Sequence, residues 1–216
     1  GGDFLLARAS VIIASFGLPR LLVLTAAVLE DLVKGELMQA TRDPAQLTSM
    51  GHYLEKTYCK TASLMANFLE AVAAVAAPGD DGAVAAARAY GSHLGLAFQV
   101  VDDLLDITSD TATLGKPACS DMRNGIPTAP VLYAAEEAPE LVKLVGRRFK
   151  YLGDVRRATR LLHTTHGLER ARVLAEEHAA AAVAAVRALP PPPNKLAAEA
   201  REALIAITRM VLQRKK

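Results

Sequence analysis

Apolar residues recur at helical spacing through most of the chain, and Gly and Pro separate one such stretch from the next. No segment shows several residues of strict apolar and polar alternation between turns, which is the pattern of a half-buried strand. The pattern therefore predicts an all-α fold. Helices are expected at residues 4–16, 19–40, 46–76, 82–107, 127–137, 139–149, 152–164, 168–188 and 194–213.

One long irregular segment, residues 108–130, interrupts this helical pattern and is rich in Gly, Pro, Ser and Thr. No fixed-period repeat is present, and no shift in composition marks a boundary between domains. Residues 1–216 are therefore expected to form a single all-helical domain.

Composition narrows the class of protein. Hydrophobic residues make up 51% of the 216 residues and the formal net charge is +2, which excludes a disordered chain and a strongly basic nucleic-acid binder. The two cysteines, Cys59 and Cys119, are expected to be free thiols in a reducing, intracellular setting. No uncharged apolar stretch reaches the roughly 18 residues that a membrane span requires, so no transmembrane segment is expected.

A polar stripe interrupts the helix expected at residues 82–107. In the stretch GLAFQVVDDLLD, Gln99, Asp102 or Asp103, and Asp106 are spaced so that they share one face of a helix whose other sides are apolar. Neighbouring carboxylates repel one another unless protons, basic side chains or a cation neutralise them. Oxygen ligands without His or Cys favour a hard ion, Mg²⁺ before Zn²⁺. The stripe predicts a magnesium site, and a solvent-facing acidic patch is an equal alternative from this helix alone.

Two cationic segments favour the metal site. Lys60 and Thr61 stand at the start of the apolar run TASLMANFLEAVAAVAA, where a lone ammonium would be costly unless it met an anion. Lys116 and Arg123 lie in the irregular segment that leaves the same end of the acidic helix. Lysine binds phosphate as a point charge, and threonine donates a hydrogen bond. Cations and carboxylates around one cavity indicate a diphosphate that is held by magnesium.

Five segments carry a resemblance to a known family. They are GDFLLARA (2–9), VLEDLVKGELMQ (28–39), YLEKTYCKTASLMAN (53–67), GLAFQVVDDLLDITS (95–109) and LGKPACSDMRNGIPTAPVL (114–132). Together they resemble the trans-type polyprenyl diphosphate synthases, and within that family the long-chain solanesyl and decaprenyl diphosphate synthases. The resemblance implies an antiparallel helical bundle around a central cavity, usually dimeric. Such an enzyme extends an allylic diphosphate with isopentenyl diphosphate units, here for quinone side chains.

The resemblance also implies a metal site. Asp102, Asp103 and Asp106 match the second aspartate-rich motif of the family and are expected to hold Mg²⁺ against the allylic diphosphate. Asp102 is the expected direct ligand, and the other two are expected to act partly through metal-bound water. The basic residues 214–216 match tails that approach a diphosphate in this family, although a frayed, solvated end is favoured here.

Further residues match family positions that contact substrate. Lys60, Thr61 and Lys116 are the expected catalytic residues. Arg123 stands where the family often has lysine, which keeps the charge but changes the hydrogen-bond geometry. Gln39 belongs to a GExxQ element that matches a family element lining the cavity near the allylic substrate. A polar cluster at the end of a helix is an equal alternative explanation for these residues. The expected substrate-binding residues are Lys60, Thr61, Gln99, Lys116, Arg123 and Gln39.

One departure from the family concerns its first aspartate-rich motif, which normally precedes the GD segment at residues 2–3 and is absent from this sequence. The chain is therefore expected to be the C-terminal portion of such an enzyme and to be inactive alone. A non-catalytic partner subunit of a heteromeric synthase is the alternative. A class I terpene cyclase would need an NSE-like metal motif, and residues 140–216 contain none. The expected compartment is a mitochondrion or plastid in a eukaryote and the cytoplasm in a bacterium.

Overall fold

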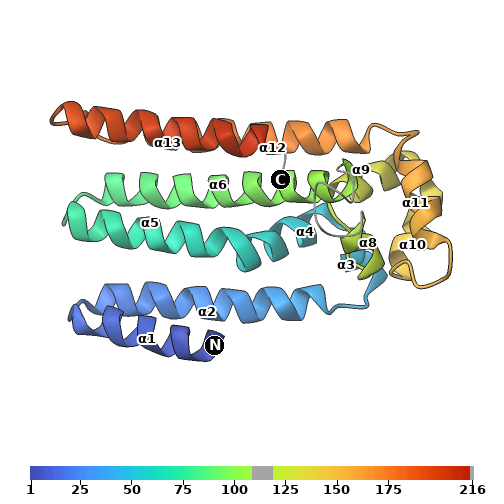
Figure 1. The fold of residues 1–216 in the computed structure, drawn as a ribbon, viewed down its shortest axis with the longest axis horizontal. Helices are drawn as coiled ribbons and strands as arrows, with labels where there is room; N and C mark the ends of the chain where they lie inside the picture. Colours follow the sequence, from blue (N-terminus) through green and yellow to red (C-terminus); the bar gives the residue numbers. More distant parts are fainter. Residues whose placement is uncertain (109–118, 215–216) are drawn as a thin grey trace.

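The computed structural model describes residues 1–108 and 119–214, and every regular element in those ranges is a helix (Figure 1). The predicted all-α fold is therefore confirmed. The helices are α1 (Gly2–Ser15), α2 (Pro19–Gln39), α3 (Pro44–Leu47), α4 (Met50–Thr57), η1 (Tyr58–Ala62), α5 (Ser63–Ala76), α6 (Asp81–Thr108), α8 (Ser120–Arg123), α9 (Ala129–Glu137), α10 (Pro139–Gly146), α11 (Asp154–Leu162), α12 (Gly167–Arg187) and α13 (Lys195–Gln213).

The long helices lie side by side, and the short helices α3, α8, α9, α10 and α11 gather at one end of them (Figure 1). Helix α6 is central, because it packs against α5 on one side and against α12 on the other. Short connections make successive long helices antiparallel (Figure 1). At the turn between α5 and α6, the carboxylate of Asp80 accepts a hydrogen bond of 2.8 Å from the backbone N–H of Ala83, which caps the first turn of α6.

Most of the predicted helices are present, and three differences have local causes. The helix predicted at 46–76 is interrupted at Ser49, whose hydroxyl accepts a hydrogen bond from the backbone N–H of His52 and so caps α4. Helix α10 ends at Gly146, three residues before its predicted end, because Arg148 and Phe149 adopt left-handed φ angles of 55° and 53°. The one-turn helix α8 lies within the segment predicted to be irregular.

Within the described residues, many of the buried apolar side chains belong to three clusters. The first is at the end of the bundle that holds the short helices, and it contains Leu141, Leu144 and Leu162. The second joins α4, α6, α9 and α12 around Tyr53 and Leu104. The third lies between α6, α12 and α13. The second cluster matters most for function because it fixes α4 against the acidic half of α6.

Close packing brings α6 against η1 and α5. A Cβ atom added at Gly95 would lie 2.5 Å from the Cα of Ala62, and one added at Gly91 would lie 2.5 Å from the carbonyl oxygen of Met65. No side chain fits between backbones at such distances, so glycine is required for this approach. The consequence is that the polar stripe of α6 faces the helical turn that carries Lys60 and Thr61.

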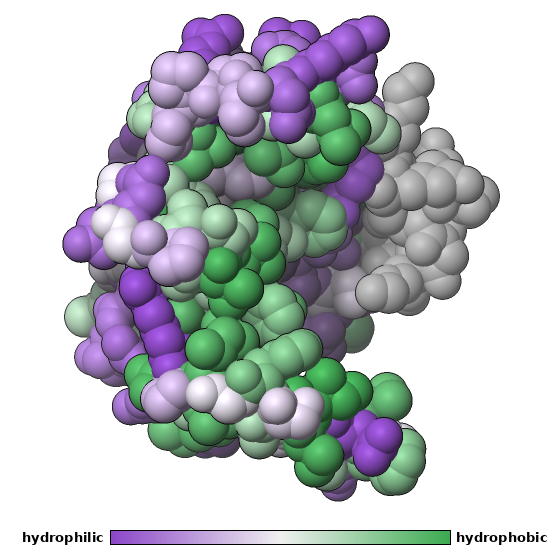
Figure 2. Space-filling model, turned by 90° about the vertical axis from the view of Figure 1, so that its left-hand side faces the viewer, coloured by the Kyte–Doolittle hydropathy of each residue, from purple (hydrophilic) through white to green (hydrophobic). Residues whose placement is uncertain are grey.

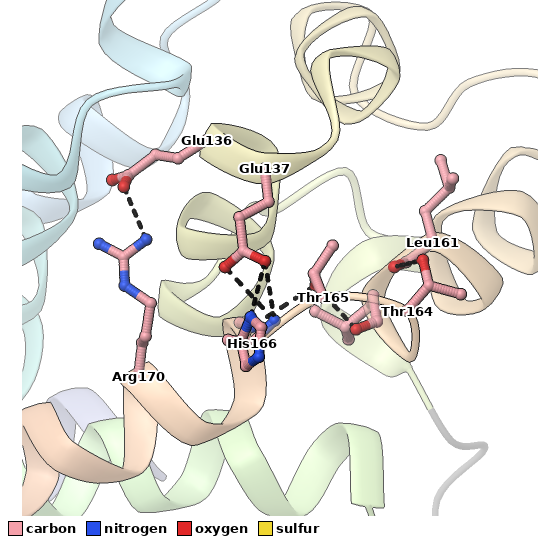
Figure 3. A network of polar contacts seen from close by, with 9 residues as sticks. Glu136, Glu137, Leu161, Thr164, Thr165, His166 and Arg170 are labelled. Atoms are coloured by element: carbon pink, nitrogen blue, oxygen red, sulfur yellow. Dashed lines mark hydrogen bonds and ion pairs between the residues drawn. The ribbon is translucent and has the colours of Figure 1, made fainter.

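A polar network joins α9 to the start of α12 (Figure 3). The carboxylate of Glu137 accepts hydrogen bonds from the backbone N–H of His166 and lies 3.0 Å from the Nδ1 atom of its ring. Arg170 donates a hydrogen bond of 2.7 Å to Glu136. The neighbouring Glu137 carboxylate raises the pKa of His166, which favours the protonated, charged form of the His166 ring. The network therefore connects the C-terminal end of α9 with the first turn of α12.

One helical run among the described residues, Met50–Ala76, is long and apolar enough by length and composition to cross a membrane. The absence of uncharged apolar stretches in the sequence did not indicate this run, because it carries charged residues such as Lys56 and Lys60. In the structure this run packs against both α2 and α6, and it carries Lys60 close to its middle. It is therefore a central helix of the bundle.

Helices α1 and α2 leave a large apolar surface exposed. None of the residues of α1 is buried, and α2 buries only Leu24 and Gly35. Apolar side chains of α1, α2 and α5 line a groove of about 390 Å³, and Figure 2 shows hydrophobic residues gathered in a hollow above α1. A surface of this kind on a protein usually contacts another protein segment.

Candidate functional site

Lys60 and Thr61 lie on a π-helical turn, η1, inside the otherwise α-helical run from α4 to α5. Single π-turns within α-helices often occur at functional sites. The ammonium of Lys60 lies 2.7 Å from Glu36 Oε1 and donates a hydrogen bond of 2.9 Å to Gln39 Oε1, both on α2. A Cβ atom added at Gly35 would lie 2.5 Å from Lys60 Cγ, so the glycine makes room for the lysine side chain to cross α2.

A chain of hydrogen bonds connects this turn with α6 and α4. The hydroxyl of Thr61 donates to Gln99 Oε1 at 3.0 Å, and the amide of Gln99 donates to Asp103 Oδ1 at 2.9 Å. The hydroxyl of Tyr53 donates to the other oxygen of Asp103 at 2.6 Å. Both carboxylate oxygens of Asp103 therefore have donors from protein side chains.

Asp103 is buried, with an exposed fraction of 3%. Burial raises the pKa of its carboxyl to about 7, although the hydrogen bonds from Tyr53 and Gln99 favour the charged form. Burial also raises the pKa of Tyr53 well above its usual value, and the adjacent Asp103 adds to this effect. Asp103 thus lies inside the bundle, and its position is fixed by α4.

Asp102 points to a different partner. Its side chain is 55% exposed, and Asp102 Oδ1 accepts a hydrogen bond of 2.8 Å from Arg214. The guanidinium of Arg214 also lies 4.1 Å from the ring centroid of Phe98, and its side chain is only 21% exposed. The expectation of a frayed, solvated end is therefore wrong for Arg214, because an ion pair and an aromatic ring hold it. Lys215 and Lys216 lie outside the described residues.

Asp106 caps a helix. Its two carboxylate oxygens accept hydrogen bonds from the backbone N–H groups of Ser120 at 3.0 Å and Asp121 at 3.1 Å, at the start of α8. The three aspartates of the motif thus have three different sets of partners. Over residues 1–108 and 119–214, no three His, Cys, Asp or Glu side chains lie close enough together to hold a metal ion.

A cavity of about 180 Å³ opens between α4, η1, α6 and the segment that follows α8. It brings together five of the predicted site residues, namely Gln39, Lys60, Thr61, Gln99 and Asp103, whereas Asp102 and Asp106 are not part of its lining. Arg123 is exposed and is not part of its lining, and Lys116 lies outside the described residues. The residues that line the cavity are Gln39, Tyr53, Lys56, Thr57, Lys60, Thr61, Gln99, Asp103, Asp121, Ile126 and Thr128.

Sequence reasoning missed Tyr53 and Lys56 as residues of this cavity. Their spacing was informative, since Tyr53, Lys56 and Lys60 are three and four residues apart and share one face of the α4–η1 run. Burial lowers the pKa of Lys56, and the carboxylates of Asp103 and Asp121 oppose this effect. The cavity therefore contains two ammonium groups rather than one.

The carboxylates fit magnesium in part. Mg²⁺ usually retains several waters and binds proteins through one or two carboxylates together with substrate phosphates. The exposed carboxylate of Asp102 suits this mode, since its partners are an ion pair with Arg214 at one oxygen and a long hydrogen bond of 3.5 Å from the Gln99 amide at the other. Asp103 and Asp106 already accept two hydrogen bonds each. The arrangement can therefore hold an anion beside Lys60 and a hydrated cation at Asp102.

Fold and site together define an all-helical protein in which lysine, threonine, glutamine and aspartate side chains face one cavity. A family model described as polyprenyl synthetase matches residues 1–162, and the chain belongs to this family.

Curated relatives cover the whole chain. The mitochondrial solanesyl-diphosphate synthase 1 of Oryza sativa subsp. japonica is 45% identical over 215 residues, which are 100% of this chain and 50% of the relative. The decaprenyl-diphosphate synthase of Dictyostelium discoideum is 40% identical and is covered to 45%. The chain thus spans about half the length of the curated relatives that it matches.

Solved structures share the fold. The apo form of an Arabidopsis medium/long-chain length prenyl pyrophosphate synthase superposes with a TM-score of 0.90 at 43% identity, covering 100% of this chain and 72% of that protein. A polyprenyl synthase from Caulobacter crescentus, complexed with calcium and isoprenyl diphosphate, gives a TM-score of 0.84 at 36% identity, covering 100% and 65%. The latter protein therefore binds a divalent cation and an isoprenyl diphosphate on the fold that this chain shares.

Proposed function

We propose that this chain is part of a long-chain trans-polyprenyl diphosphate synthase, a prenyltransferase that condenses an allylic diphosphate with isopentenyl diphosphate to make quinone side chains. The observation that best supports this function is the cavity in which Lys60 and Thr61 face Gln99 and Asp103. The calcium and isoprenyl diphosphate complex of the Caulobacter relative gives independent support for a diphosphate ligand.

The chemistry of ionisation matches these groups. Breaking the C–O bond of an allylic diphosphate leaves a carbocation and places negative charge on the leaving oxygens, so donors that are aimed at those oxygens accelerate the step. Lys60 would supply positive charge, and the Thr61 hydroxyl, now bonded to Gln99, would donate to a phosphate oxygen. Each preorganised donor of this type contributes on the order of 3 to 4 kcal/mol. No side-chain nucleophile is required.

Magnesium is the proposed cofactor. Bound Mg²⁺ supplies Lewis-acid neutralisation of a diphosphate. Asp102 would be its direct protein ligand, which requires Arg214 to leave the carboxylate. Asp103 would support the site from its buried position beside Gln99, and Asp106 would act through the position of α8 or through metal-bound water.

Three further residues are proposed to bind substrate, namely Gln39, Arg123 and Lys116. Of these, Lys116 is also proposed to have a catalytic role.

Calorimetric titration of the 216-residue protein with inorganic pyrophosphate and Mg²⁺ tests the site. We expect metal-dependent binding by the wild-type chain, and at least about a tenfold loss of affinity, or about 1.4 kcal/mol, in Asp102→Asn. Glu199→Gln is the matched control, because Glu199 is an exposed carboxylate on α13, and it should bind like the wild type. Absence of metal-dependent binding in the wild type, or equal affinity in Asp102→Asn, would contradict the proposal.

The same protein should not elongate a prenyl chain by itself, since the relatives are about twice as long as the part that this chain covers. Mixing it with Mg²⁺, an allylic diphosphate and labelled isopentenyl diphosphate should give no labelled product, and turnover would contradict this expectation. Metal-dependent pyrophosphate binding also distinguishes a diphosphate-binding portion of an enzyme from a non-catalytic partner subunit, which has no need of such a site.

We further propose that the whole protein forms a homo- or hetero-oligomer, usually a dimer in this family, through the exposed apolar surface of α1 and α2. Large apolar side chains are exposed on α1 and α2, and they include Phe4, Leu5 and Val23. Their exposure supports an interface on this surface. A mitochondrial or plastid location is proposed for a eukaryotic source, because curated relatives from rice and Arabidopsis thaliana have mitochondrial or chloroplastic names.

A further inference from the structure

Lys56 is the feature of the cavity that the proposed chemistry does not yet use. It lies on α4, one helical turn before Lys60, and it lines the cavity together with Lys60, Thr61 and Gln99. Its ammonium is 5.1 Å from the centroid of the Tyr53 ring. The residue is partly buried, and it belongs to the wall of the cavity.

Within the described parts of the chain, the ammonium of Lys56 forms no hydrogen bond and no ion pair within 4.0 Å. Asp103, the buried carboxylate that lines the same cavity, already accepts hydrogen bonds from Tyr53 and Gln99. Lys60 differs, because Glu36 and Gln39 bind its ammonium directly. A partly buried ammonium without a direct hydrogen bond or ion pair is costly unless an anion occupies the adjacent space, even with an aromatic ring beside it and carboxylates further away.

The space adjacent to Lys56 suits a phosphate group. The cavity has a volume of about 180 Å³, and its lining includes a second lysine, Lys60, and the residues Thr57 and Thr61. Lysine binds phosphate as a mobile point charge with three donors, so it can reach an oxygen without the fixed fork geometry of arginine. Since Lys56 and Lys60 are four residues apart, their side chains project from the same face of the α4–η1 run.

We propose that Lys56 is a further substrate-binding residue, whose ammonium contacts an oxygen of the diphosphate that occupies this cavity. The inference rests on the proposed function, because it names an additional residue of the same diphosphate site. Lys56 and Lys60 would then both contact the anion, Lys56 from α4 and Lys60 from η1, where its ammonium lies against α2. The competing explanation is structural, with Lys56 acting only as a countercharge for the buried Asp103 and the partly buried Asp121.

Substitution of Lys56 separates the two explanations. Lys56→Met and Lys56→Gln both remove the charge, and the glutamine variant keeps a polar side chain in case the methionine variant folds poorly. We measure binding of inorganic pyrophosphate with Mg²⁺ by calorimetry, and thermal unfolding without ligand by circular dichroism. We expect at least a tenfold loss of affinity in a folded variant, partial recovery in Lys56→Arg, and no change in Lys150→Met, where the lysine is exposed.

Each outcome gives a decision. Pyrophosphate binding by the wild type together with unchanged affinity in the folded Lys56 variants would overturn the inference and leave the proposed function intact. A lower melting temperature with unchanged affinity would assign Lys56 to the countercharge role, which also overturns it. Absence of pyrophosphate binding by the wild-type protein would overturn the proposed function and this inference with it.

Discussion

Helices α12 and α1 are both rich in apolar residues, yet they have opposite environments. Helix α12 lies against α6, α9 and α13 and buries residues along its whole length, from Gly167 to Val186. Helix α1 packs mainly on α2 and buries none, although it includes Phe4, Leu5, Val11 and Ile12. A helix that is apolar on every side is normally enclosed by other helices. The contrast shows that an apolar pattern predicts that a helix is covered, but not by which segment or which chain.

The two regions also differ in their polar groups. The region around α4, α6 and α12 contains the buried carboxylate of Asp103, which accepts hydrogen bonds from Tyr53 and Gln99. The groove between α1, α2 and α5 is lined almost wholly by apolar side chains. The first region therefore offers charged and hydrogen-bonding partners to a charged ligand, whereas the second suits an apolar surface of a protein segment.

The largest expected effect comes from making the same substitution in both regions. Leu162 is 0% exposed and Leu5 is 68% exposed. Under conditions in which the chain is monomeric, Leu162→Ala should lower the free energy of unfolding by about 2 to 5 kcal/mol, because it leaves a cavity in the core. Leu5→Ala should change it by no more than about 0.5 kcal/mol. Urea unfolding measures both values.

Equal losses in the two variants would contradict the contrast between the regions. At higher protein concentrations, where the proposed oligomer forms, Leu5→Ala should weaken self-association in sedimentation experiments. Leu162→Ala should leave the association constant of the folded protein unchanged, since Leu162 lies far inside the cluster around α10 and α11.

A smaller effect is expected from the buried hydrogen bond between Tyr53 and Asp103. Tyr53→Phe removes the 2.6 Å donor and leaves one carboxylate oxygen of Asp103 without a side-chain partner, so the free energy of unfolding should fall by about 1 to 3 kcal/mol. Tyr151→Phe is the control, because Tyr151 is an exposed tyrosine that should tolerate the change within about 0.5 kcal/mol. Chemical unfolding without metal measures the difference, and equal stability of both variants would show that the Tyr53 hydrogen bond is not stabilising.

Sequence patterns predicted the long helices because their periodicity and their breakers are local. The extent of α6 follows from its apolar face, and the start of α2 follows from Gly17 and Pro19. The break at Ser49 depends on one capping hydrogen bond, and the end of α10 depends on two left-handed residues. Such features compete with helix propensity by small energies, so the periodic pattern does not show them.

The candidate site was predictable to the extent that its residues follow helical spacing. Gln99 and Asp103 share a face of α6, and Lys60 and Thr61 face them across the contact that Gly95 permits. The partners of Asp102 and Asp106 were not predictable in this way. Arg214 reaches Asp102 from 112 residues away, and the N-terminus of α8 reaches Asp106 only after the chain has folded back. These contacts depend on the tertiary arrangement and leave no periodic signal.

His93 and His178 give the smallest expected effect within the packed region. The two side chains lie on adjacent faces of α6 and α12, and their Nδ1 atoms are 3.0 Å apart. Within the described residues, the Nε2 atom of His178 is buried without a hydrogen-bond partner. No sequence pattern indicates this pair, because the two residues are far apart in the chain. Burial lowers the pKa of both imidazoles, and His93 lowers that of His178 further, although Glu177 opposes this.

The histidine pair should therefore make stability depend on pH. Because both pKa values are lower in the folded state than the value of about 6.5 in the unfolded chain, protonation favours unfolding, and stability falls as pH drops below that value. His178→Gln should reduce the loss of melting temperature between about pH 7.5 and about pH 5.5, whereas His163→Gln, at an exposed position, should retain the full loss. Asp103, whose pKa is about 7, contributes equally to all three proteins, so it cancels in the comparison. Identical pH profiles for wild type and His178→Gln would show that the pair is not coupled to folding.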